Sequence, residues 1–144
     1  MKTYTIITET DDLISCALYY KDNVFIGTAQ CHEDDMDMRS SLTGGTIAEA
    51  RAQIKLYQHI KNNEIKPALK ALKQLYYSMN RSKHFNKKSY ESKMLYRQIR
   101  LKEKELATTN EFIVDAKESL KEYLKNKEEI HQQIRERRLE AANK

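Results

Sequence analysis

The chain has 144 residues, a formal net charge of +5, 33% charged residues, three Gly, one Pro and no Trp. This length fits one domain, or a small domain with one long appendage, and the composition is typical of a helical protein with few loops. Because no apolar run approaches the roughly 18 residues that span a bilayer, and neither a signal region nor a cysteine framework is recognisable, we expect a soluble, cytoplasmic protein without a membrane partner.

The first 30 residues have the alternating pattern of β-strands. The stretches "KTYTIIT", "SCALYY" and "VFIGTAQ" are rich in β-branched and aromatic residues, and Asp22-Asn23 favours a tight turn between the second and the third. We therefore expect a three-stranded antiparallel meander over residues 2–30.

The period changes to that of a helix at Thr46. The apolar spacing predicts two helices, over residues 46–62 and 66–80, with a break between them at the polar stretch "NNEIK". Thr46 and Glu49 form a capping box that marks the start of the first helix. Gly44-Gly45, directly before it, would let the chain turn sharply.

A long helix is expected over residues 88–138, with Asn86 or Ser89 as its N-cap. Along it, twelve positions from Leu95 to Ile134 follow an unbroken 4-3 spacing, and nine of them are apolar, which is the signature of a coiled coil. The residues expected to form the seam of a dimer are Leu95, Ile99, Leu106, Ile113, Leu120, Tyr123, Ile130 and Ile134.

Such a seam must be covered, either by a second copy of the chain or by the two shorter helices after a turn near residues 107–110. We expect the second copy, and so a homodimer, because a period of 3.5 residues specifies a supercoil. The predicted fold class is α+β: a small N-terminal antiparallel β-sheet packed on helices, followed by a long C-terminal coiled-coil helix. The predicted domains are an α+β head, 1–82, and a helical coiled-coil segment, 83–144.

Charge is unevenly distributed along the chain. Residues 1–45 hold three basic and eight acidic residues, a net charge of −5, whereas residues 46–144 hold 23 basic and 13 acidic residues, a net charge of +10. This separation favours either a polyanionic partner or a polarised surface that binds a protein.

A Cys-His pair beside an acidic run raises the question of a metal site. Structural zinc sites need ligand pairs spaced so that their side chains converge, and the side chains of Cys31 and His32 diverge if both lie in a strand. The acids that follow lack the Gly and Glu positions of a calcium loop. We therefore expect neither a metal nor another cofactor.

Catalytic patterns are also missing from the sequence. Cys31 and His32 cannot form a nucleophile–base pair as strand neighbours, and the chain has no phosphate-binding Gly loop. We expect a protein that is not an enzyme.

The polar stretch after residue 80 is the best signal for nucleic acid. It interleaves basic and aromatic residues, which suit phosphates and bases respectively. The basic residues of this alternative site are Arg81, Lys83, Lys87 and Lys88. The alternative function is thus a nucleic-acid-binding accessory protein.

The stretch from Gly27 to Ala52 resembles a pattern in small bacteriophage and prophage proteins: G-x-A-x-C-x-x-x-D, a short loop, then G-x-x-I-A-x-x-R-A. The matching residues are Gly27, Ala29, Cys31, Asp35, then Gly44 or Gly45, Ile47, Ala48, Arg51 and Ala52. The resemblance implies a viral origin and a small α+β head, and no chemistry. Physically, the alanines would let helix and sheet approach closely, and Asp34 or Asp35 could pair with Arg51.

Together these patterns predict a non-enzymatic phage-type accessory protein in the host cytoplasm. It would bind a host protein, as an inhibitor of an antiviral defence system, by occlusion through its helical surface and acidic head. The expected protein-binding residues are Glu33, Asp34, Asp35, Asp37, Tyr90, Tyr96, Arg97 and Arg100.

Overall fold

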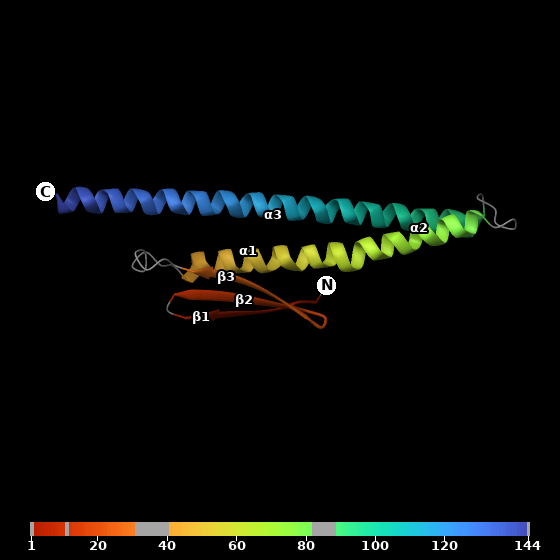
Figure 1. The fold of residues 1–144 in the computed structure, drawn as a ribbon, viewed down its shortest axis with the longest axis horizontal. Coiled ribbons are helices and arrows are strands. Elements are labelled where there is room, and N and C mark those ends of the chain that lie inside the picture. Colours follow the sequence, from red (N-terminus) through yellow and green to blue (C-terminus); the bar gives the residue numbers. More distant parts are fainter. Residues whose placement is uncertain (1, 11, 31–40, 82–88, 144) are drawn as a thin grey trace. The chain divides into compact units, whose positions relative to one another are not determined.

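The computed structural model describes residues 2–10, 12–30, 41–81 and 89–143 (Figure 1). Its elements are three strands, β1 (Tyr4–Glu9), β2 (Leu13–Tyr20) and β3 (Asn23–Gln30), followed by the helical elements α1 (Ser41–Ile60), η2 (Lys61–Ile65), α2 (Lys66–Asn80) and α3 (Tyr90–Ala142). The α+β class is confirmed, because an N-terminal three-stranded sheet packs on a helix and one long helix follows toward the C-terminus. No helix within the described ranges is long and apolar enough to cross a membrane.

The chain divides into two compact units that are not contiguous in sequence. Unit 1 combines residues 1–56 with residues 114–144, and unit 2 is residues 57–113. Helices α1 and α3 each contribute residues to both units. The predicted domain boundary between residues 82 and 83 stays a prediction.

In unit 1 the three strands form the predicted antiparallel meander in the order β1-β2-β3. Tyr20 pairs with Asn23, so the tight turn consists of Lys21 and Asp22, one residue earlier than predicted. Lys21 has a φ of 53°, a left-handed conformation that costs an L-residue about 1–2 kcal/mol.

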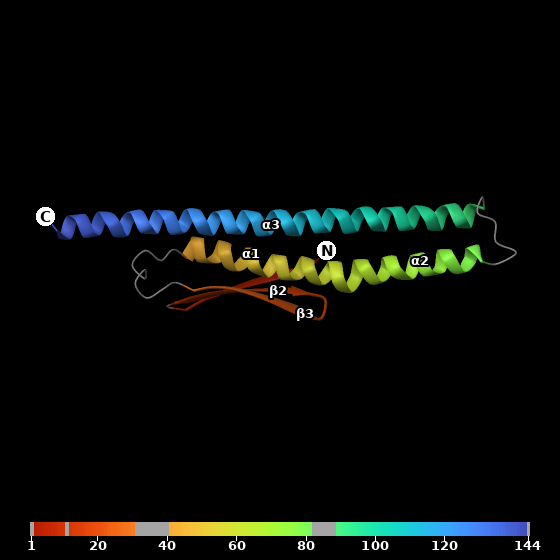
Figure 2. The same cartoon turned by 45° about the horizontal axis from the view of Figure 1, so that its top comes forward.

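Helix α1 covers one face of the sheet (Figure 2). Cys16 of β2 and Ala48 and Ala52 of α1 have no exposed surface, and Ala29 is buried, which confirms the predicted close approach of helix and sheet. A Cβ atom on Gly27 would collide with the backbone oxygen of Ala48. Helix α1 therefore lies so close to β3 that the strand residue facing it at position 27 must be a glycine.

Helix α1 begins at Ser41, five residues before the predicted start, so Thr46 lies inside the helix and is not its N-cap. Gly44 and Gly45 are helical as well, not a turn. A Cβ atom on Gly44 would collide with the side chain of Ile14, so this glycine serves close packing of the helix on β2. Glycine disfavours a helix locally, and the tertiary contact overrides that preference.

The predicted break at "NNEIK" is wrong, because helix continues through it as one π-helical segment, η2. The N–H of Lys66 bonds to the carbonyl of Lys61, five residues back. Pro67 stands in the first turn of α2. In an α-helix its ring would clash with the carbonyl four residues back, and a wider π-turn before it is a common way to relieve that clash.

Ser89, one of the two predicted candidates, is the N-cap of α3. Its Oγ accepts a hydrogen bond from the backbone N–H of Ser92 at 3.2 Å. The other candidate, Asn86, lies outside the described residues.

Unit 2 is an antiparallel helical hairpin. Its first arm is the end of α1 with η2 and α2, and its second arm is the first half of α3 (Figure 1). The rings of Tyr57 and Phe112 are 4.3 Å apart, and the rings of Tyr76 and Tyr96 are 6.1 Å apart. The buried side chains along this hairpin are Ile65, Leu69, Ser92, Ile99 and Ile113.

Candidate functional site

The helical hairpin of unit 2 presents a group of tyrosines with one arginine. The ring of Tyr76 lies 6.2 Å from that of Tyr77 and 6.1 Å from that of Tyr96, measured between centroids. The guanidinium of Arg100 stands over the Tyr96 ring at 5.7 Å, within the range of a cation–π contact. We call these four residues the tyrosine cluster. Tyr77 and Tyr96 are 61% and 50% exposed, so the cluster offers aromatic surface to a partner.

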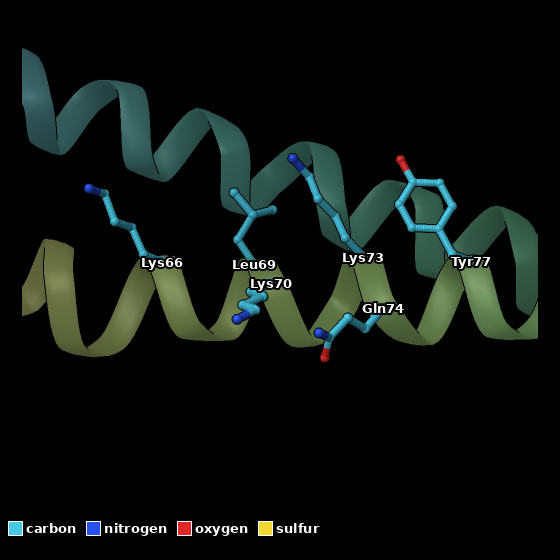
Figure 3. Close-up of a pocket in the computed structure, with 6 residues that line it drawn as sticks. All are labelled: Lys66, Leu69, Lys70, Lys73, Gln74 and Tyr77. Carbon is cyan, nitrogen blue, oxygen red and sulfur yellow. The ribbon is translucent and has the colours of Figure 1, made fainter.

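A shallow groove on α2 shares Tyr77 with this cluster (Figure 3). It encloses about 290 Å³ and is lined by Lys66, Leu69, Lys70, Lys73, Gln74 and Tyr77. We call it the lysine groove. In Figure 3 the side chains of Lys66, Lys73 and Tyr77 point toward α3, whereas those of Lys70 and Gln74 lie over the front of α2. The buried Leu69 gives the groove an apolar floor.

The lysine groove carries positive charge that is largely free to act on a partner. Lys73 Nζ lies 3.7 Å from a carboxylate oxygen of Glu103, with both side chains about two-fifths exposed. A solvent-exposed pair of this kind stabilises a fold by only about 0–1 kcal/mol, because water and salt screen it. Exchanging Glu103 for the carboxylate of a binding partner therefore costs little.

The structure brings together two of the four predicted helical anchors, Tyr96 and Arg100. Tyr90, 74% exposed, is the first residue of α3, and Arg97 is exposed further along the same helix. The predicted acidic anchors, Glu33, Asp34, Asp35 and Asp37, lie outside the described residues, as do Cys31 and His32.

The alternative nucleic-acid site is described at one position only. Arg81 is exposed and directly follows α2, whereas Lys83, Lys87 and Lys88 lie outside the described residues.

The predicted seam is divided between different environments. Its first positions lie in the hairpin of unit 2, where Ile99 and Ile113 are buried and Leu95 and Leu106 half-buried. A second copy could reach these four only if the hairpin opened. In unit 1, Leu120 and Ile134 are half-buried, while Tyr123 and Ile130 are exposed. Dimerisation through the seam stays a prediction, with Tyr123 and Ile130 as its accessible positions.

Within the part of the chain that the structure describes, no three His, Cys, Asp or Glu side chains gather as metal ligands. The thiol of Cys16 is buried, and burial, with a smaller contribution from the negative charge of Glu49, raises its pKa above the ordinary value. A buried thiol with a raised pKa is a poor nucleophile.

Sequence reasoning missed the lysine groove. Its signal was present in the spacing of Lys66, Lys70, Lys73 and Tyr77, which recur every three or four residues as one helical stripe does. Spacing alone does not distinguish this stripe from a solvated helix face, because the tyrosine cluster that continues it includes Tyr96 of α3.

Comparison with protein-family models, with curated proteins and with solved structures finds no match.

Proposed function

We propose that this chain is a non-enzymatic, phage-type accessory protein that binds a host protein and acts as an inhibitor of an antiviral defence system by occlusion. The phage assignment and the choice of target are supported by the Gly27–Ala52 pattern alone. Protein binding has separate support, from the surface of the helical hairpin.

The observation that carries the proposal is the continuity of the tyrosine cluster with the lysine groove at Tyr77. Tyrosine and arginine are the residues most often responsible for binding energy at protein interfaces, because they bury large rigid surfaces at a low entropic cost. Tyr96 is held by contacts on both sides, to Tyr76 and to Arg100. Binding would therefore require little further ordering of its side chain.

The charge of this surface defines the partner. Lys66, Lys70, Lys73 and Arg100 would attract an acidic protein surface and accelerate its association. The acidic run from Glu33 to Asp37 would add a second contact, of opposite sign, to a basic part of the same partner.

Affinity capture from a lysate of a bacterial host tests the proposal, with the bound proteins identified by mass spectrometry. The test variant is Lys66→Glu with Lys70→Glu. The control is Lys121→Glu with Lys125→Glu, which makes the same charge change at two exposed lysines of α3. We expect one protein to be captured by the wild type and by the control, and to be lost with the test variant.

Two results would contradict this proposal. One is equal capture of that protein by wild type and test variant, since the lysine groove would then be unimportant. The other is recovery of nucleic acid without a specific protein.

A nucleic-acid-binding accessory function is the second candidate. It is favoured by the exposed ring of Tyr77 beside three lysines, which is the combination that binds stacked bases and phosphates. It requires a shift of a generic oligonucleotide at low salt that disappears at physiological salt. Charge reversal at Lys83, Lys87 and Lys88 would abolish this shift, and no shift at low salt removes the candidate.

A further inference from the structure

The sheet of unit 1 has a second face, opposite α1, that is apolar and exposed. Directly paired residues of neighbouring strands share a face. The register places Tyr4 beside Tyr19 and Tyr19 beside Val24, and it places Ile6 beside Ala17 and Ala17 beside Ile26. These two rows form what we call the outer face. Tyr4 is 74% exposed, and Ile6, Val24 and Ile26 are each about half exposed.

The outer face carries no charged side chain along the three strands. A third row consists of Thr8, Ser15 and Thr28, so even its polar part is neutral. The exposed area of its five large apolar side chains is roughly 600 Å², which is at the upper end of the largest apolar patch on a typical monomer. A patch of this size and neutrality marks an interface.

One edge of the sheet, strand β3, is already covered by side chains of α1. The carbonyl oxygens of Thr28 and Ile26, on β3, accept hydrogen bonds of 2.6 Å from Arg51 Nη1 and Lys55 Nζ of α1. Two cationic side chains at a sheet edge oppose the addition of another strand. Association of the sheet through β3 is therefore hindered, whereas nothing comparable protects the outer face.

We propose that a second copy of this chain occupies the outer face, so that two sheets stack as a β-sandwich with each α1 on the outside. Aligned sheets pack about 10 Å apart with interdigitating side chains. Ala17 lies between Ile6 and Ile26 in the register, so a small side chain alternates with larger ones across this face. One surface thus supplies both ridge and hollow, as a two-fold interface requires.

Charge and area favour a second copy over an unrelated protein. Two copies of this charged chain repel each other least where both present neutral side chains, and the outer face is neutral on each copy. Two such faces would bury about 1,200 Å², the lower limit for a specific interface, so we expect a dissociation constant in the micromolar range.

Sedimentation equilibrium on the full chain, at about 10 to 100 μM, tests the proposal. The wild type is expected to be a dimer, and Ile26→Lys a monomer, because two lysines would be buried in the shared interface. Ile130→Lys is the matched control: it makes the same change at an isoleucine of similar exposure on α3, in the predicted helical seam. It is expected to remain a dimer. Far-UV circular dichroism confirms that each variant is folded, and Val24→Lys replaces Ile26→Lys if the latter unfolds.

Three outcomes would overturn the proposal. The first is a monomeric wild type across this concentration range. The second is a wild-type dimer that persists in folded Ile26→Lys or Val24→Lys. The third is a dimer that Ile130→Lys dissociates and Ile26→Lys does not, which would assign dimerisation to the seam of α3.

Discussion

Three glycine-to-alanine substitutions are expected to change stability in different directions. At Gly27, the added Cβ would collide with the backbone oxygen of Ala48 and lie 2.5 Å from the backbone nitrogen of Ala52. Both are backbone atoms of a packed helix, so α1 itself must move away from the sheet. Overpacking of a buried site costs about 1–3 kcal/mol, and the rigidity of the obstacle places Gly27→Ala near the upper end.

Gly45 provides the control, because a Cβ there meets nothing within 4 Å. Alanine favours a helix interior over glycine by about 0.8–1.0 kcal/mol, so Gly45→Ala is expected to stabilise the fold. Gly44→Ala, one residue earlier, would collide with the Ile14 side chain, which can partly move aside. It is expected to fall between the other two.

Urea unfolding followed by far-UV circular dichroism, at one fixed protein concentration, measures all three changes. The expected separation in unfolding free energy between Gly45→Ala and Gly27→Ala is about 3 to 4 kcal/mol. A neutral or stabilising Gly27→Ala would refute the close approach of α1 to β3. A destabilising Gly45→Ala would refute the start of α1 at Ser41 and restore the predicted turn at the two glycines.

Three further predictions concern single residues. Lys21→Gly should be about 1 kcal/mol more stable than Lys21→Ala in the same urea assay, because both lose the contact of Lys21 with the Tyr20 ring and only glycine adopts a φ of 53° without the penalty of a side chain. Ser89→Ala should destabilise the chain by about 1 kcal/mol and Ser89→Asp should not, since only the former removes the cap of α3. Because burial raises the pKa of Cys16, the unfolded chain loses the thiol proton at a lower pH than the folded chain does. The contribution of the neutral thiol to the free energy of unfolding is therefore complete below the ordinary thiol pKa and is lost as pH rises through the raised value. Unfolding free energy should thus fall more steeply from pH 8 to 10 in the wild type than in Cys16→Ala, and parallel curves would contradict the burial of this thiol.

Local patterns predicted the elements that depend on local physics. The alternation of the first 30 residues gave the meander, and a serine before a long apolar repeat gave the cap of α3. Local rules failed where a tertiary contact decides the outcome. Gly44 disfavours a helix and yet lies inside one, because Ile14 requires the space that a Cβ would take.

The helical seam was predicted on the correct helix, and its positions differ in exposure. After Ile113, the predicted Leu120 and Ile134 are half-buried, whereas the predicted Tyr123 and Ile130 are exposed and the residues that follow them, Leu124 and His131, are half-buried. An α-helix has 3.6 residues per turn, so its covered face drifts away from a strict 3.5-residue repeat. The sequence predicted Tyr96 and Arg100 of the tyrosine cluster but not Tyr76 and Tyr77, because Tyr76 and Tyr96 meet only when α2 and α3 pair.

We propose that a protein partner binds the surface where the lysine groove meets the tyrosine cluster. Isothermal titration calorimetry with the purified captured protein measures this most directly, using the wild type, Lys66→Glu with Lys70→Glu, Tyr96→Ala, and the Lys121→Glu with Lys125→Glu control. We expect Tyr96→Ala to weaken binding about 30-fold, which corresponds to about 2 kcal/mol, and the groove variant to weaken it at least about 10-fold. The control should bind within about twofold of the wild type. Equal affinities for all four proteins, or equal losses for the groove variant and its control, would contradict the claim.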